Sequence, residues 1–284
     1  MSTIKSRLRR EKIAKILMQL AGIGITGSLF LIIGIILFKG LPHLTWDMIS
    51  QTPQGGFYIG KEGGILNAIL GSFYLAGLST ILACLIGLPI AIYLNAYVDQ
   101  TSTLSRVSKL LFDILFGIPS IVYGAIAFSI MITLGIRASL LGGVITITLL
   151  TIPIVVRTLD ELLKTIPLDL KNTTTSLGAT RWQTAQILLK YIKPGLFTAL
   201  LLAFGRAIGD VAGVLLTTGF SDNLPLYLDE PAATLPLAIF FQLSSPIPEV
   251  QGRAYASALI LTFIILIIVI CTHILASRQK KHRL

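Results

Sequence analysis

Six runs of apolar residues, each long enough to cross a lipid bilayer, decide what kind of fold this chain can form. They occupy residues 17–38, 65–94, 110–136, 138–156, 195–220 and 254–276. A helix needs about 20 apolar residues to cross the roughly 30 Å of hydrocarbon in a membrane. Only 13% of the residues are charged, against about 25% in a soluble domain. The sequence therefore predicts an all-α polytopic membrane protein with six transmembrane helices, placed in the cell membrane.

Other classes of protein are excluded by the same composition. The chain is 54% hydrophobic, and disordered chains have low hydrophobicity. Its two cysteines, Cys84 and Cys271, lie inside apolar runs and cannot form the disulfide framework of a small secreted domain. The first apolar run is longer than that of a signal peptide and is followed by no cleavage-site pattern, so we expect a retained anchor.

The basic residues indicate how the chain is oriented. The net charge is +10, but the lysines and arginines sit in short segments between the apolar runs. Eighteen of the 23 fall in the two tails and in the connections after the second and fourth runs, which all lie on one side of a six-span chain. Since basic loops stay in the cytoplasm, both termini are predicted to be cytoplasmic. The basic tails are topology signals next to membrane lipid, and no nucleic-acid partner is expected.

The runs and loops divide the chain into four parts. Residues 1–16 are a basic cytoplasmic tail, and residues 17–64 hold the first transmembrane helix and an outer loop. Residues 65–276 form a domain of five helices, and residues 277–284 are a second cytoplasmic tail. The five-helix domain contains a long cytoplasmic loop, residues 157–193, between its third and fourth helices.

The loop 157–193 is too long for a minimal connection and too polar to enter the membrane. Pro167 favours the first position of a helix, and Asp169 falls in the first turn, where the helix dipole favours an anion. Gly178 suits the end of that helix, and a second helix over 181–190 leads towards the fifth run. The pattern predicts a helix, a glycine turn and a helix presented to the cytoplasm, which suits docking to a soluble partner.

No catalytic pattern accompanies these helices. The sequence contains no Walker A motif, so the chain cannot bind ATP by that route. It has no nucleophile elbow, and its three histidines, at positions 43, 273 and 282, lack the spacing of metal ligands. We therefore expect no enzymatic activity and no metal or cofactor in this chain.

One charged pair lies inside the fifth apolar run. Arg206 is 11 residues into the run, which places it about 16 Å deep at roughly 1.5 Å per residue. Asp210 follows at i+4, where the two side chains can form a salt bridge. Two interpretations stay open. The pair ties helices together, or Arg206 lies on a substrate path, where its guanidinium fork matches the oxygens of an anion such as phosphate.

Small residues recur at four-residue spacing in two of the runs. Gly205, Gly209 and Gly213 form such a row in the fifth run, and a longer row follows the second run from Ala68 to Ala91. In a membrane such rows let helices approach closely. They indicate either packing within the chain or a seam with a partner subunit.

Several segments together resemble a known family. LGATRWQT at 177–184 resembles the EAA loop of ABC importer permeases, which docks on the ATPase subunit. More narrowly, the chain is similar to PstA-type permeases of phosphate-specific importers. That likeness is carried by GGILNAILGS at 63–72, GIPSIVYG at 117–124, GRAIGD at 205–210 and TLPL at 234–237. The resemblance implies the transmembrane domain of a type I ABC importer and the translocation of inorganic phosphate.

The resemblance also implies partners and roles for residues. The partners would be a second permease of PstC type, ATPase subunits of PstB type that carry ATP and Mg²⁺, and an extracytoplasmic phosphate-binding protein of PstS type. Arg206 and Asp210 would line the substrate path, and Gly205, Gly209 and Gly213 would form the seam. The residues expected to couple to the ATPase are Asn172, Thr173, Thr174, Leu177, Gly178, Ala179, Thr180 and Arg181.

The chain departs from the family pattern at three places. Asn172-Thr173-Thr174 stands where the family has Glu-Ala-Ala, Tyr191 stands where a proline usually follows the loop, and Asp210 stands where glutamate is usual. Two alternatives to phosphate import remain. One is a stand-alone anion channel or secondary transporter that uses Arg206 as its anion site. The other is an ABC permease for a different oxyanion, such as molybdate or sulfate.

Overall fold

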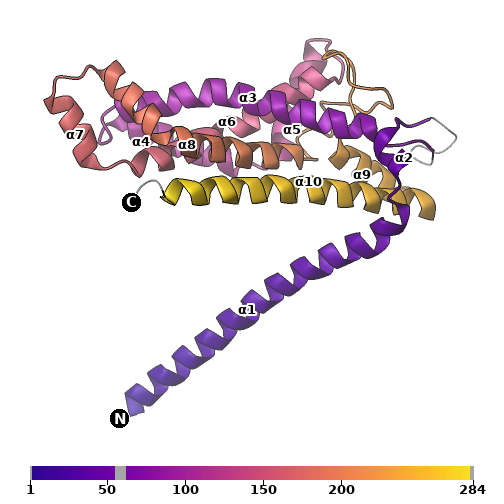
Figure 1. Ribbon diagram of the computed structural model, residues 1–284, viewed down its shortest axis with the longest axis horizontal. Coiled ribbons are helices and arrows are strands. Elements are labelled where there is room, and N and C mark those ends of the chain that lie inside the picture. Colours follow the sequence, from indigo (N-terminus) through magenta and orange to yellow (C-terminus); the bar gives the residue numbers. More distant parts are fainter. Residues whose placement is uncertain (1, 55–61, 282–284) are drawn as a thin grey trace.

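The long apolar runs form a bundle of roughly parallel and antiparallel helices in the computed structural model, which describes residues 2–54 and 62–281 (Figure 1). Within these residues, five helices are long and apolar enough to cross a membrane. They are α1 (Ser2–Gly40), α3 (Leu66–Ala96), α6 (Leu140–Lys164), α8 (Arg181–Ile208) and α10 (Pro248–Lys281). A bent pair, α4 (Thr103–Gly117) and α5 (Ser120–Thr133), could form a sixth span. The predicted all-helical membrane fold is confirmed.

Short helices mark the two ends of the bundle. The 3₁₀ helix η1 (Leu41–His43), α2 (Trp46–Ser50) and α9 (Leu235–Leu243) lie at one end, named here the α9 end (Figure 1). The helix α7 (Leu168–Ser176) lies at the other, named the α7 end, where α10 also terminates (Figure 1).

The core lies between α3, α6 and α8. Leu75, Ile147 and Ile208, one from each helix, are fully buried in a single cluster. The small residues of the second run, from Ala68 to Ala91, all lie on the buried face of α3. That row therefore serves packing within the chain, which decides between the two interpretations given for it.

The third predicted span, residues 110–136, is not one straight helix. The axes of α4 and α5 differ by 93°. Pro119 supplies the physical reason, because a proline has no N–H and excludes the helical conformation from the residue before it. Ile118 accordingly adopts an extended conformation, with φ −71° and ψ 129°. The hydroxyl of Tyr123 donates 2.9 Å to the carbonyl of Leu115 and bridges the break.

Both predicted boundaries of the fifth span, residues 195 and 220, differ from those of the helix in the structure. The helix α8 begins at Arg181 and runs without interruption to Ile208, with Pro194 inside it. The separate helix predicted over 181–190 is thus the first part of the spanning helix. Beyond Ile208 the chain leaves the helix, and residues 209–234 are turns and irregular backbone.

The irregular segment 209–234 is held by the start of α6. The amides of Ser139, Leu140 and Leu141 donate to the carbonyls of Thr217 (2.9 Å), Glu230 (2.8 Å) and Leu228 (2.7 Å). The first turn of a helix has free N–H groups, and here irregular backbone accepts from them. Non-helical backbone at membrane depth has to be buried in protein or face water, and this pairing meets part of that need.

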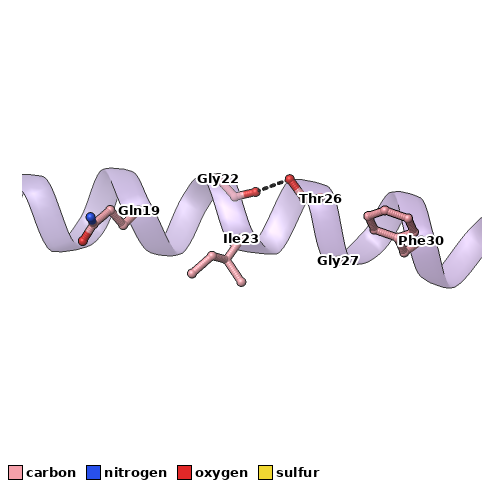
Figure 2. Close-up of a pocket in the computed structure, with 6 residues that line it drawn as sticks. All are labelled: Gln19, Gly22, Ile23, Thr26, Gly27 and Phe30. Atoms are coloured by element: carbon pink, nitrogen blue, oxygen red, sulfur yellow. Dashed lines mark hydrogen bonds between the residues drawn. The ribbon is translucent and has the colours of Figure 1, made fainter.

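The first helix has little contact with the rest of the described chain. α1 touches α10 and η1 at its carboxyl end and then diverges from the bundle (Figure 1). Figure 2 shows a shallow hollow on its surface, lined by Gln19, Gly22, Ile23, Thr26, Gly27 and Phe30, all from α1 itself. The hollow is therefore a surface feature of one helix and not a cavity of the bundle.

Candidate functional site

The first predicted helix and the glycine turn are present at the α7 end, and the second predicted helix is the first part of α8. α7 ends at Ser176, and Gly178 has φ +76°, a left-handed conformation that side chains with a Cβ rarely adopt. The hydroxyl of Thr180 accepts from the amide of Gln183 (3.2 Å), whose side chain accepts from the amide of Thr180 (2.8 Å). This reciprocal capping box starts α8 sharply. The turn between α7 and α8 is thus fixed from both sides.

The proposed coupling residues fall into exposed and buried groups. Leu177 is 81% exposed, and the neighbouring Trp182 is 64% exposed. Thr173, Gly178, Thr180 and Arg181 are also exposed, whereas Ala179 is half-buried and Thr174 is buried. The side chain of Asn172 lies outside the described part of the chain. One large apolar side chain is thus exposed on each side of the turn at Gly178.

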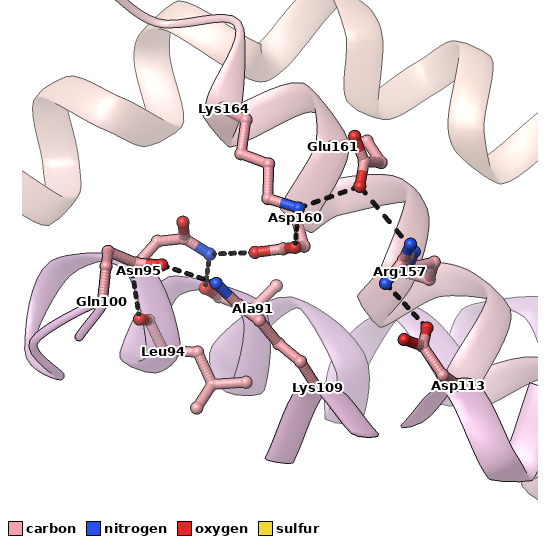
Figure 3. A network of polar contacts seen from close by, with 10 residues as sticks. All are labelled: Ala91, Leu94, Asn95, Gln100, Lys109, Asp113, Arg157, Asp160, Glu161 and Lys164. Carbon is pink, nitrogen blue, oxygen red and sulfur yellow. Dashed lines mark hydrogen bonds and ion pairs between the residues drawn. The ribbon is translucent and has the colours of Figure 1, made fainter. Parts of the chain in front are cut away.

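Both ends of this turn region are fastened to the end of α3. After the turn, the guanidinium of Arg181 donates 3.0 Å to the carbonyl of Tyr97. Before the turn, Asn95 donates 3.0 Å from its side-chain amide to the carboxylate of Asp160, in the last turns of α6 (Figure 3). The segment between Asp160 and Arg181 is therefore held at two points against residues 95–97.

A wider set of charges surrounds the Asn95–Asp160 contact (Figure 3). The side chain of Asp160 is only 7% exposed, and the ammonium of Lys164 lies 2.8 Å from its carboxylate. Burying a carboxylate is costly unless it is paired and hydrogen-bonded, and Asp160 is both. On the neighbouring turn, Arg157 lies 2.7 Å from the carboxylate of Asp113 in α4.

We did not predict this network from the sequence. Two signals could have indicated it. Asp160 and Lys164 are spaced i, i+4, the favourable order for an ion pair on a helix. Asp113 and Arg157 are opposite charges, one near the start of the apolar run 110–136 and the other directly after the run 138–156, and a single residue separates these two runs.

Arg206 and Asp210 do not form the expected salt bridge. Arg206 is exposed in the last turn of α8, and no carboxylate of the described residues lies within 4.0 Å of its guanidinium. Asp210 lies beyond the end of the helix, where its carboxylate accepts 2.7 Å from the amide of Gly213. The i+4 argument failed because the helix ends between the two residues. Asp210 instead stabilises the turn that follows.

Arg206 nevertheless lies far from either end of the bundle. Its neighbours Gly205 and Gly209 face Ile268 and Ile265 of α10, which lie near the middle of the apolar run 254–276. Lipid at this depth disfavours a charge. An exposed guanidinium here requires water or another protein surface on that face.

The three glycines of the fifth run do not form one helical stripe. A Cβ on Gly205 would lie 3.5 Å from Ile268, and one on Gly209 would lie 3.7 Å from Ile265. Gly213 lies in the turn after the helix and is buried beside Ile147 and Ser120. Gly205 and Gly209 face α10, whereas Gly213 lies beyond the end of α8, so the three do not form one continuous row on a helix. A seam with a partner subunit stays a prediction.

These features define a class of protein. The chain is a helical membrane protein of several spans, with a fixed turn at one end and an exposed arginine at mid-depth. Residues 87–281 match the family of binding-protein-dependent transport system inner membrane components. Since this match covers more than half of the chain, the protein belongs to that family.

Curated relatives extend the likeness over almost the whole chain. The phosphate transport system permease protein PstA of Haemophilus influenzae is 32% identical over 94% of this chain and 94% of its own. PstA of Yersinia pestis is 34% identical over 77% of this chain and 74% of its own. A chain of the inward-facing MetNI methionine ABC transporter has the same fold, with a TM-score of 0.60, 17% identity, and coverage of 75% of this chain and 95% of that chain.

The comparisons decide between the classes of transporter considered. The chain is the membrane subunit of an ABC transporter and not itself an enzyme, since ATP hydrolysis belongs to a partner subunit. It is an inner-membrane component with several spans. The predicted ABC permease is confirmed, and the stand-alone channel or secondary transporter receives no support.

Proposed function

We propose that this chain is the permease subunit of an ATP-driven importer for inorganic phosphate. The observation that carries the proposal is the exposed guanidinium of Arg206 at the middle of the bundle, with no carboxylate of the described residues to neutralise it. A fixed cation on a water-filled path lowers the barrier for an anion, and its fork matches phosphate oxygens. The PstA relatives narrow the anion to phosphate, whereas nothing on Arg206 itself distinguishes phosphate from molybdate or sulfate.

The α7 end faces the cytoplasm in this proposal. Eighteen of the 23 lysines and arginines then lie on the cytoplasmic side. The start of α1 and the end of α10 lie toward the α7 side of the molecule, which is consistent with this orientation (Figure 1).

The exposed turn around Leu177 and Trp182 docks the ATPase. Both side chains are apolar, and both stand beside a turn fixed by Gly178 and the Thr180 capping box. Outside the membrane such side chains gain most when a partner covers them. ATP and Mg²⁺ bind to that ATPase, and this chain itself carries no cofactor.

The assembly contains three further kinds of subunit. A second permease of PstC type covers the face of α8 that exposes Arg206, so that the two permeases line one path. ATPase subunits of PstB type bind at the α7 end. A phosphate-binding protein of PstS type delivers the anion at the α9 end.

Two measurements test the proposal. Affinity purification of the tagged chain in mild detergent should recover an ATPase and a second permease. Vesicles containing the complex and the binding protein should accumulate labelled phosphate when ATP is added, and molybdate or sulfate should compete weakly. Strong accumulation of sulfate without phosphate uptake would show that the substrate is sulfate and not phosphate. Recovery of the chain without an ATPase or a second permease would contradict the proposed assembly.

Orientation is tested by labelling single cysteines with a membrane-impermeant thiol reagent. Cys84 and Cys271 are first replaced by alanine. A cysteine at Leu226, which is exposed at the α9 end, should react from outside the cell, and one at Ser277 should not. Labelling of position 277 from outside would reverse the orientation.

A further inference from the structure

A small, partly open cavity lies at the α9 end, where the start of α3 meets α9. Its volume is about 10 Å³. The lining residues are Pro53, Ile65, Asn67, Ala68, Phe220, Asp222, Ala238 and Gln242. They come from the segment after α2, the start of α3 with the residue before it, α9, and the irregular segment between α8 and α9.

Two buried amide oxygens line this space without a hydrogen-bond partner. They are Oδ1 of Asn67, a residue 1% exposed, and Oε1 of Gln242, a residue 4% exposed. Neither oxygen has a donor among the described residues. A buried acceptor without a donor is strongly disfavoured, because folding removes its hydrogen bonds to water.

The orientation of the Asn67 amide is fixed by its other end. Its Nδ2 donates 2.7 Å to the carbonyl of Ser221. If the nitrogen and oxygen of this amide were exchanged, Oδ1 would face the carbonyl oxygen of Ser221, and both atoms are acceptors. The atom without a partner is therefore Oδ1. The missing group is therefore a donor.

We propose that this cavity holds one water molecule, which donates one hydrogen to Asn67 Oδ1 and the other to Gln242 Oε1. A space of about 10–15 Å³ is the smallest that accepts a water. A water supplies two donors, and two acceptors are unsatisfied. The water joins α3 to α9 and completes the contact that Asn67 begins with Ser221.

A metal ion fits this place less well. Calcium takes about 6–8 oxygen ligands, and magnesium requires an octahedral set. The lining side chains offer two neutral amides and the carboxylate of Asp222, which belongs to an exposed residue. A neutral donor satisfies the two amides without needing further ligands.

The sign of one stability change tests the proposal. Gln242→Met removes the amide and keeps the length of the side chain. If the cavity were empty, this variant would remove an unsatisfied acceptor, and the Tm of the full chain in detergent would rise or stay unchanged. With the water present, the substitution removes a hydrogen bond, and we expect the Tm to fall by about 2–4 °C.

Thr234→Val is the matched control. Thr234 Oγ1 is also buried and without a partner among the described residues, but it does not line the cavity. Its replacement should leave the Tm unchanged or raise it. If the Tm of Gln242→Met also rises or stays unchanged, the proposal of a bound water is wrong.

A double variant separates the water from simple loss of packing. If one water serves both amides, the loss in Asn67→Leu with Gln242→Met is smaller than the sum of the two single losses, because the first substitution already removes the bridge. Additive losses would contradict the bridging water.

A salt test distinguishes the water from a cation. If the Tm rises in sodium chloride but not in choline chloride, the cavity holds a cation and not a water. Density for one ordered atom between the two amides in a high-resolution structure would support the water directly.

Discussion

The guanidinium of Arg181 donates a 3.0 Å hydrogen bond to the carbonyl of Tyr97, although 84 residues separate them in the sequence. Arg181 is the first residue of α8, and Tyr97 directly follows α3. The α7 segment, residues 160–181, is therefore held at both ends by residues 95–97, since Asn95 also bonds to Asp160. A partner that displaces α7 therefore acts on α3 as well.

The first prediction concerns Asp160. Asp160→Ala removes the buried carboxylate, so the Asn95 amide loses one of its two acceptors and keeps only its hydrogen bond to the carbonyl of Ala91. Lys164 is half-exposed and regains water, so we expect a loss of about 1–3 kcal/mol in the free energy of unfolding. Thermal or chemical unfolding of the purified chain measures it. The control is Glu161→Ala, because that exposed carboxylate should cost about 0–1 kcal/mol; equal losses would contradict the role given to the buried contact.

The second prediction concerns Gly178. A β-branched residue disfavours its left-handed conformation, so Gly178→Val should distort the turn that presents Leu177. We expect the complex to assemble but to hydrolyse ATP with little phosphate uptake. Gly135 also has a positive φ, +69°, and open space around it, but it lies outside the α7 segment. In Gly135→Val, phosphate uptake per amount of complex should be unchanged. Normal uptake in Gly178→Val would exclude the turn as the coupling element.

The third prediction concerns a close approach of backbone to α3. A Cβ on Gly71 would lie only 2.0 Å from the carbonyl oxygen of Ala233, which cannot move without its segment. Gly71→Ala should therefore reduce the amount of folded protein severely. A Cβ on Gly77, six residues further along the same helix, would meet no atom of another segment within 4 Å. Gly77→Ala should stabilise the helix by up to about 1 kcal/mol; similar yields of the two variants would refute the predicted clash.

The fourth prediction concerns Arg206. Arg206→Gln keeps polarity and removes the charge, so we expect an assembled complex with little phosphate uptake. Arg206→Lys should recover only a small part, because an ammonium lacks the bidentate fork. Asp210→Asn should be mild, since an amide oxygen can still accept from Gly213. Uptake is measured against the amount of complex in the membrane, and normal uptake by Arg206→Gln would remove the residue from the path.

The sequence predicted features that depend on length and local chemistry. Apolar runs indicated the class of fold, because lipid requires a minimum span. Gly178 indicated the turn before α8, because few other residues adopt that backbone conformation.

The errors arose where a hydropathy run continues but the helix does not. Pro119 and Gly209 are both compatible with an apolar run, yet the first breaks the third span and the second ends α8. The salt bridge between Arg206 and Asp210 was wrong for the same reason, because α8 ends between the two residues. The Asn95–Asp160 bond joins residues 65 positions apart, and no local pattern in one sequence indicates such a pair.

The continuity of α8 has a mechanical consequence. Its 28 residues extend about 42 Å at roughly 1.5 Å per residue. The proposed docking turn precedes the first residue of α8, and Arg206 lies in its last turn, so one continuous helix connects them. A tilt of about 5° at the Arg181 end would carry Arg206 sideways by about 3 Å, about the length of one hydrogen bond. A small movement of the ATPase would thus be enough to make or release contact between Arg206 and an anion, without any change of fold between them.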